Sequence, residues 1–519
     1  MIRKIFFLAF AISLFTANSQ SISWQQAYGG TNSDKAIKII KTNDGNLVWA
    51  GYYKSTDGDF STNLGNYDIF VIKTDLNGNL IWRTVFGGTN VDYVTDIIET
   101  SNGDFILTGN SKSNDNDITG NHGNYDALVV KLDNSGTIVW QKSFGGSSTD
   151  KATSVVEMTN GNFLVLAYTK STDGDVSSSI GGYDVWLLKL DTNGSIVAQN
   201  SIGGSNDEKS SKIYKAINGK YMITSYSKSN NGDVANNQGN YDFWVVQINN
   251  DLSIAWSYTF GGSGIDNESV LFDNSSGAVE NYILAGASAS NDGNITNAKG
   301  SFDMCLINFD AAGNIIWQNN IGGTQADFPK DIQKLDNAIC NCFILVGFSN
   351  SEDNDFPTNY DHYDGEVLVI NDTGNPVSTR NYGGNDKDNF MSFVQISDIA
   401  NNNPDIIVVG STKSNDNDVS GQHGNYDAWI VRINDDSNSI SNNDASNITY
   451  YPNPANQIIH INAKNIKEVE LIDLSGKILI DKKGIFNSYD LNISNISKGN
   501  YLIKIRTNKG LSIKKIIIK

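Results

Sequence analysis

The chain has 519 residues, of which 48 are glycine and 6 are proline, and its formal net charge is −19. Many glycines with few prolines favour tight turns between strands and exclude collagen or proline-rich linkers as the main architecture. Because residues 447–519 are net basic, the acidic excess lies in the middle of the chain. Such a surface repels nucleic acid and anionic lipid, and it suits cations or neutral partners such as glycans.

Residues 1–19 have the features of a secretory signal peptide. Arg3 and Lys4 precede the apolar run Ile5–Phe15, and Ala17 and Ser19 are small residues at the expected cleavage positions. The run is too short to span a bilayer, and no later run reaches the roughly 18 apolar residues that a spanning helix needs. We therefore expect an exported protein without a membrane span.

A motif that recurs seven times dominates residues 20–436. Its paired glycines follow one another at intervals of 58 residues and, in the last two intervals, 61 residues: Gly29-Gly30, Gly87-Gly88, Gly145-Gly146, Gly203-Gly204, Gly261-Gly262, Gly322-Gly323 and Gly383-Gly384. An acidic residue stands four residues after every pair: Asp34, Asp92, Asp150, Glu208, Asp266, Asp327 and Asp388. Self-similarity at a fixed period indicates a repeat architecture.

Each repeat contains four short predicted strands. In the first repeat they cover residues 35–41, 47–53, 69–72 and 80–86, with the turns Asn43-Asp44-Gly45 and Asn77-Gly78 between paired strands. Such turns between apolar runs are typical of β-hairpins, and no period of 3.6 residues indicates helices. Four strands in each of seven repeats predict an all-β fold, a seven-bladed β-propeller over residues 20–436.

The two ends of the repeat region complement each other. Residues 23–30 align with a fourth strand that has no preceding strands, whereas the last repeat has no fourth strand of its own. We expect the N-terminal strand to complete the last blade, because this pairs an otherwise exposed sheet edge. Over residues 21–436 the repeats resemble bacterial propeller repeats of exported proteins, a resemblance that implies a fold and no chemistry.

The composition changes after a Ser- and Asn-rich stretch, residues 437–447, which we interpret as a linker. Residues 448–519 contain, in order, Tyr451-Pro452-Asn453-Pro454, Leu474-Ser475-Gly476, Lys498-Gly499-Asn500-Tyr501 and a Lys-Ile terminus. This order resembles the type A sorting domain of type IX secretion cargo. The resemblance implies a small β-sandwich, the type IX machinery as a partner, and delivery through the periplasm to the outer-membrane surface or the medium.

The loop between the second and third strands of each blade repeats a pattern of acidic residues. A first acid is followed by others two and eleven residues later, in the sets Asp57/Asp59/Asp68, Asp115/Asp117/Asp126, Asp173/Asp175/Asp184, Asp353/Asp355/Asp364 and Asp416/Asp418/Asp427. Clustered carboxylates are ligands that Ca²⁺ prefers, so calcium is a candidate cofactor of these loops. The same residues also form Asx-turns without any metal, and recurrence in every blade favours that interpretation.

Catalytic motifs are absent from the sequence. His122 and His423 occupy the same loop position in two repeats and are interpreted as turn residues, and the three cysteines do not form a disulfide framework. Two functions remain: a surface binding or adhesion module for a glycan or surface protein, and an extracellular polysaccharide hydrolase or lyase. The regular blades favour binding, because propeller enzymes usually carry catalytic groups on insertions that break the repeat.

Overall fold

A computed structural model describes residues 20–276, 279–335, 341–360, 362–396, 405–435, 449–473, 477–507 and 510–519. The predicted signal peptide and linker lie outside these ranges. The chain divides into two compact units, a propeller of residues Ile22–Asn434 and a C-terminal unit that begins at Asp435. No helix in the described ranges is long and apolar enough to cross a bilayer.

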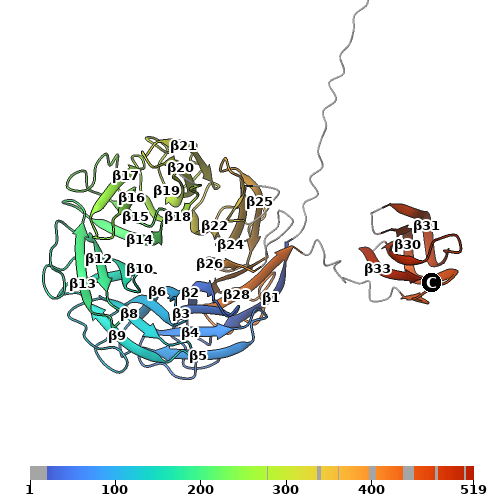
Figure 1. Cartoon of the computed structure of the whole chain (residues 1–519), viewed down its shortest axis with the longest axis horizontal. Coiled ribbons are helices and arrows are strands. Elements are labelled where there is room, and N and C mark those ends of the chain that lie inside the picture. Colours follow the sequence, from blue (N-terminus) through green and yellow to red (C-terminus); the bar gives the residue numbers. More distant parts are fainter. Residues whose placement is uncertain are drawn as a thin grey trace, which may run out of the picture. The chain divides into compact units, whose positions relative to one another are not determined.

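Seven four-stranded sheets form the propeller and are arranged in a ring (Figure 1). Blades one to three comprise β2 (Asp34–Lys41), β3 (Leu47–Tyr53), β4 (Asp68–Thr74) and β5 (Leu80–Phe86); β6 (Asp92–Glu99), β7 (Phe105–Ser111), β8 (Asp126–Leu132) and β9 (Ile138–Phe144); and β10 (Asp150–Glu157), β11 (Phe163–Thr169), β12 (Asp184–Leu190) and β13 (Ile196–Ile202). Blades four to six comprise β14 (Glu208–Lys215), β15 (Tyr221–Ser227), β16 (Asp242–Ile248) and β17 (Ile254–Phe260); β18 (Asp266–Asp273), β19 (Asn281–Ser288), β20 (Asp303–Asp310) and β21 (Ile315–Ile321); and β22 (Asp327–Lys334), β23 (Phe343–Ser349), β24 (Asp364–Ile370) and β25 (Pro376–Tyr382). The seven-bladed fold that the repeat predicts is thus confirmed.

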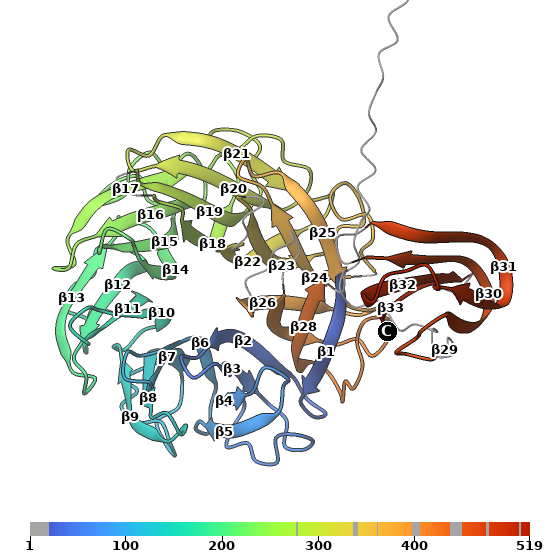
Figure 2. The same cartoon turned by 45° about the vertical axis from the view of Figure 1, so that its right-hand side comes forward.

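Blade seven combines the two ends of the propeller. It contains β26 (Asp388–Gln395), β27 (Ile406–Thr412), β28 (Asp427–Asp435) and β1 (Gln20–Tyr28), with β1 paired to β28 at the outer edge (Figure 2). On β1, the side-chain amide of Gln25 donates to the carbonyl of Asp418 at 2.6 Å and its oxygen accepts from the indole of Trp429 at 2.9 Å. The predicted closure by the N-terminal strand is confirmed.

Seven buried apolar clusters join the blades, each built from two neighbouring blades. In the cluster that joins blade seven to blade one, Trp49 and Phe70 pack with Ile407 and Ile430. The other six clusters lie at the remaining junctions. Because every blade buries both faces against neighbours, the core is a closed cycle of interfaces without an exposed sheet face.

The first strand of every blade carries a β-bulge against the second. The register shifts fall at Ile37, Thr95, Thr153, Ser211, Glu268, Lys330 and Met391. A bulge interrupts the alternation of side chains and re-aims them locally. Here all seven bulged residues line the central cavity.

The C-terminal unit contains five strands in one hydrogen-bonded network: β29 (Thr449–Tyr451), β30 (Ile458–Ile472), β31 (Ile478–Asn492), β32 (Gly499–Thr507) and β33 (Gly510–Ile518). Its core contains Ile461, Val469 and Ile503. The motif at Tyr451–Pro454 is tied to the last strand, because Asn453 Oδ1 accepts from the amide of Ile517 at 2.9 Å. The opening motif and the terminus are therefore parts of one unit.

The cysteines differ from the sequence-based expectation at one position. Cys342 is disulfide-bonded, whereas Cys305 is a free, buried thiol. Cys340 lies outside the described residues. Three cysteines without a repeating spacing predicted no disulfide framework, but Cys342, which stands directly before β23, forms a disulfide.

Candidate functional site

The predicted calcium ligands at the start of the acidic loops accept hydrogen bonds from backbone amides of the loop that leads into their own blade. The carboxylates of Asp57, Asp115, Asp173 and Asp416 accept the backbone amides of Thr31, Thr89, Ser147 and Asn385 at 2.8, 2.8, 2.7 and 2.9 Å. The second acids Asp59, Asp117 and Asp175 accept the amides of Gly29, Gly87 and Gly145 at 3.0, 3.4 and 3.2 Å. Asp418 donates its own amide to the carbonyl of Gly383 at 3.1 Å.

The third acids of the pattern are buried at the start of the third strand. Asp68, Asp126, Asp184 and Asp427 are 0 % exposed, and each accepts, through Oδ2, the amide of the residue four positions earlier. Their Oδ1 atoms have no hydrogen-bond partner, and neither do those of Asp242, Asp303 and Asp364. All seven blades therefore share a buried carboxyl group with one unused oxygen.

Each of these carboxyl groups faces the acid that begins the next blade. At the junction of blades four and five, a Cβ on Gly261 would lie 2.6 Å from Asp242 Oδ1 and 2.7 Å from Asp266 Oδ2. Burial and then the Asp266 carboxyl raise the pKa of Asp242 to about 7. At six of the seven junctions, a Cβ on the first glycine would meet oxygens of both acids, and at Gly87 it would meet Asp68, so a side chain has no room there.

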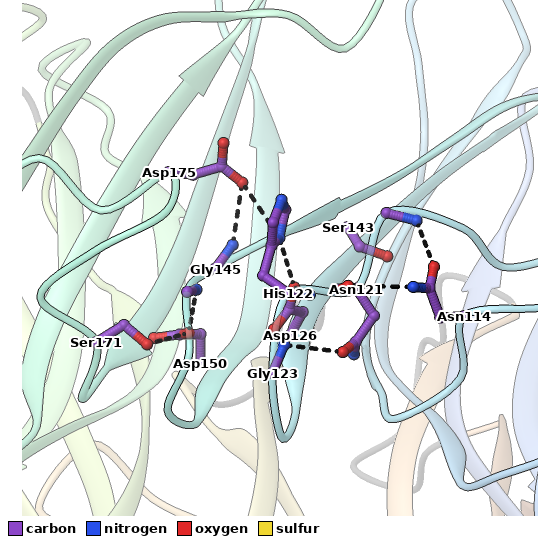
Figure 3. Close-up of polar contacts among 12 residues, drawn as sticks. Asn114, Asn121, His122, Gly123, Asp126, Ser143, Gly145, Asp150, Ser171 and Asp175 are labelled. Carbon is purple, nitrogen blue, oxygen red and sulfur yellow. Dashed lines mark hydrogen bonds and ion pairs between the residues drawn. The ribbon is translucent and has the colours of Figure 1, made fainter.

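Figure 3 shows how His122 joins this arrangement at the junction of blades two and three. Its Nδ1 lies 2.9 Å from Asp126 Oδ2 and 3.8 Å from Asp175 Oδ2. His423 makes the corresponding contact with Asp427 at 2.8 Å. Both histidines thus contact the loop carboxylates.

The fifteen acids of the five predicted sets do not gather into clusters of three. Within the described part of the chain, three acidic or metal-binding side chains come within 4.8 Å of one another only at Glu468, Glu470 and Asp481, in the C-terminal unit. Lys483 and Lys504 already form ion pairs with Glu468 and Glu470. Calcium binding by the propeller loops stays a prediction, and a cation there would compete with the backbone amides that now occupy the carboxylates.

The central channel is a cavity with a volume of about 980 Å³. Its wall comes mainly from the first strands, through the bulged residues and their neighbours. Tyr52, Tyr93, Tyr168 and Tyr226 line it together with Lys151. A cavity of this size, with aromatic side chains and several charged groups in its wall, is within the range of ligand sites in proteins.

Two ion pairs span the channel, and their four residues occupy the same position in their blades. Lys38, Asp96, Lys212 and Asp331 all stand four residues after the acid that begins their blade. Lys38 Nζ lies 3.4 Å from Asp331 of blade six, and Lys212 Nζ lies 3.6 Å from Asp96 of blade two. Asp96 and Asp331 also accept the hydroxyls of Ser154 and Ser392 at 2.6 and 2.9 Å. These pairs bridge blades that are not neighbours in the ring.

Lysines pack on tyrosine rings near the channel in blades one to four, and one of them, Lys151, lines the channel itself. Lys112 and Lys151 both lie 4.4 Å from the centre of the Tyr125 ring, and Lys209 lies 5.0 Å from that of Tyr183. In blade one, Lys35 lies 4.2 Å from the centre of the Tyr426 ring. We call the four lysines Lys35, Lys112, Lys151 and Lys209 the lysine rim. None of them makes an ion pair with another described residue.

The lysine rim concentrates positive charge. Burial and then the neighbouring Lys209 and Lys112 lower the pKa of Lys151. Burial and Lys387 likewise lower the pKa of Lys35. Like charges held together without counter-ions form a site for an anion, because an anion removes their repulsion.

The lysine rim was not predicted from the sequence. The signal was present in the residue directly after each blade's first acid, which is Lys35, Tyr93, Lys151, Lys209, Asn267, Phe328 or Asn389. Lysine at three of these positions faces a tyrosine on the second strand, in the pairs Lys35/Tyr52, Lys151/Tyr168 and Lys209/Tyr226. The overall acidity hid these few cations, because net charge averages over the whole surface.

Comparison with known proteins shows what the C-terminal unit does. Residues 449–519 match a family described as secretion system C-terminal sorting domain. The chain therefore carries a type IX sorting domain, which directs export and either secretion or attachment at the cell surface. No curated protein matches the chain.

Solved structures with a similar arrangement share little sequence with this chain. The extracellular domain assigned to a one-component system of B. thetaiotaomicron aligns with 94% of this chain at 11% identity and a TM-score of 0.40, and the chain covers 57% of it. Drosophila Semaphorin 1b, extracellular domains 1-2, aligns with 80% of this chain at 10% identity and a TM-score of 0.41, with 87% of that structure covered. A subtype N11 neuraminidase-like protein of A/flat-faced bat/Peru/033/2010 aligns with 79% of this chain at 10% identity and a TM-score of 0.37, with 94% covered. Similarity at this level assigns no ligand and no activity.

Proposed function

We propose that this chain is an exported recognition module that binds an acidic glycan at the channel mouth of its propeller. The sorting domain would bring the propeller to the outer-membrane surface or the medium, where such polymers are met. The observation that carries the proposal is the lysine rim beside a channel lined by tyrosines.

The chemistry of the rim suits sugars that carry carboxylate or sulfate groups. Tyrosine rings offer large apolar faces with a polar tip, against which a sugar ring can pack. The unpaired lysines supply the opposite charge, and they do so on a propeller whose overall charge is negative. An anionic glycan would therefore be attracted to the rim and repelled by the acidic loops around it.

The channel gives little support to the other candidate, a polysaccharide hydrolase or lyase. Glycoside cleavage usually needs two carboxyl groups that are free to act as acid and base or nucleophile. The acids that line the channel are Asp96, Glu268 and Asp331, and each forms an ion pair with a lysine. Binding is the function that this geometry supports best.

Binding of polygalacturonate and dextran sulfate, with neutral dextran for comparison, tests the proposal. We expect the parent to bind the two anionic polymers, more weakly as salt increases, because exposed charges are screened. Lys151→Gln combined with Lys209→Gln should weaken binding at least tenfold. Lys142→Gln, on the exposed side of β9, is a matched control that should bind like the parent. Equal binding of dextran, or no loss in the double variant, would contradict the proposal.

A further inference from the structure

Blade six contains a second pocket, of about 340 Å³, that shares no lining residue with the channel cavity. Its wall includes Phe356 and Pro357 from the acidic loop, Thr379 and Asn381 from β25, and Glu366 from β24. This volume is at the small end of the range of ligand sites in proteins. It is sufficient for one small molecule or one side chain.

Glu366 is the unusual group in this pocket. Its side chain is 0 % exposed, and neither carboxyl oxygen has a hydrogen-bond partner. Burial, and then the nearby Asp364 and Asp327, raise the pKa of Glu366 well above its usual value. A buried carboxylate without a partner is costly, so the group stays protonated unless a cation reaches it.

The other six blades place a different kind of residue at this position. Two residues after the third-strand acid they have Phe70, Leu128, Trp186, Trp244, Cys305 and Trp429, all buried. No structural requirement of the blade therefore calls for a glutamate. Its presence in one blade alone points to a role that the other blades do not have.

Two further departures in blade six help to open the pocket. In blades two, three and five a glutamine of the fourth strand accepts an amide from the acidic loop, in the pairs Gln141/Thr119, Gln199/Ser177 and Gln318/Thr296. Thr379 has the same register position in blade six. Pro357, which has no amide hydrogen, replaces the loop donor. The glutamine and its partner are both absent, and the space they would fill belongs to the pocket.

We propose that the blade-six pocket binds a primary ammonium group, carried by an amino sugar or by a lysine side chain, which pairs with Glu366. An ammonium group has three donors, and the two free oxygens of Glu366 with the hydroxyls of Ser378 or Thr379 can accept them. The apolar rings of Phe356, Pro357 and Pro376 would enclose the carbon skeleton of the ligand. Asp355, also in the wall, already pairs with Lys299, so Glu366 is the carboxyl group left for the ligand.

Binding of this kind must release a proton. Glu366 is protonated in the empty pocket, and pairing with an ammonium ion requires the carboxylate, so the carboxyl proton passes to solvent. Proton release has two consequences that binding of an uncharged ligand in the same pocket would not have. The affinity rises with pH below the pKa of the ligand amine, and the heat of binding depends on the ionisation enthalpy of the buffer.

Calorimetric titration of the full-length mature chain in two buffers of different ionisation enthalpy tests the proposal. The probes are glucosamine, the amide of Nα-acetyl-lysine and, as a neutral match, N-acetylglucosamine. We expect one or both amines to bind with proton release and the neutral sugar not to bind. The amine that binds identifies the source of the ammonium group.

Two variants separate the role of the carboxyl group from folding. Glu366→Gln preserves the shape and should reduce amine affinity at least tenfold, with no remaining dependence on buffer. Glu366→Leu introduces the residue that blade two has at Leu128, and it should abolish binding while melting at or above the parent. Both variants should bind polygalacturonate like the parent, because the channel mouth is unaffected.

Other results would overturn the proposal. These are no binding of either amine, equal binding of N-acetylglucosamine, or unchanged amine affinity in Glu366→Gln. A calcium-dependent stabilisation that Glu366→Gln removes, without amine binding, would assign the pocket to a metal ion instead.

Discussion

The buried carboxyl groups at the blade junctions lie in pairs. At each junction an aspartate with an unused oxygen faces the acid that begins the next blade, and the latter already accepts amide and hydroxyl donors. Asp266, for example, accepts from Gly262, Ser288 and Ser290. Two buried carboxyl groups side by side do not both ionise readily. In the Asp242–Asp266 pair, where burial raises the pKa of both groups, one shared proton gives the unused oxygen of Asp242 a role, because a protonated Oδ1 can donate towards Asp266.

This arrangement predicts that stability falls as the pH rises from 5 to 8. Burial raises the pKa of Asp242 to about 7 and that of Asp68 to about 6, above the values of an unfolded chain. The native state then binds more protons than the unfolded state, so its advantage is complete at low pH and is lost as the pH passes the folded pKa values. We expect the melting temperature to decrease across this window, as measured by differential scanning fluorimetry.

Asp242→Asn should reduce this pH dependence. The asparagine side chain resembles the protonated carboxyl group. Its oxygen can take the place of Asp242 Oδ2, which accepts the Gln238 backbone amide, and its NH₂ group can then donate to Asp266. The variant should melt like the parent at pH 5 and above it at pH 8. Asp75→Asn is the control, because the half-buried Asp75 accepts turn amides and its pKa is lowered. That control should leave the slope between pH 5 and pH 8 unchanged, and an identical slope in Asp242→Asn would contradict the prediction.

At the scale of strands and loops, the sequence was informative where structure is local. Turns such as Asn77-Gly78 and the alternation of apolar residues are local signals, and the hairpins they predict are present. The channel wall was not predictable in this way. Which residues of β2 or β10 face the channel depends on a β-bulge, and a bulge follows from pairing with a neighbouring strand rather than from the strand's own pattern.

The acidic loops offer a direct test between their two interpretations. Asp115 accepts the amide and hydroxyl of Thr89 at 2.8 and 2.6 Å, and Asp117 accepts the amide of Gly87. We expect the double variant Asp115→Ala and Asp117→Ala to melt several degrees below the parent, because these amides lose their partners. The decrease should be the same in millimolar calcium and in chelator. A larger decrease in calcium would support the calcium hypothesis and would show that the carboxylates bind the ion in preference to the loop.

For the whole molecule, ring closure was predictable because it depends on a count of strands. The repeat region begins with a single strand that belongs to no complete blade, and it ends with a blade that has no fourth strand. The first strand can therefore complete the last blade. The ion pairs across the channel, Lys38–Asp331 and Lys212–Asp96, were not predictable from the sequence, because they join blades that are distant in the chain. The closing strand β1 and these channel pairs act at opposite edges of the blades, outer and inner.

Removal of Gln20–Tyr28 tests the outer closure. Without this strand β28 becomes an exposed edge, the Trp429 indole loses its acceptor Gln25, and Trp49 loses the Tyr28 ring at 5.1 Å. We expect the truncated mature chain to melt lower by on the order of 10 °C, from several lost contacts at a few degrees each, and to self-associate through the free edge. A synthetic peptide of residues 20–28 should restore both the melting temperature and the monomer, whereas a scrambled peptide should not. Melting at the parent temperature as a monomer, without peptide, would show that blade seven does not need β1.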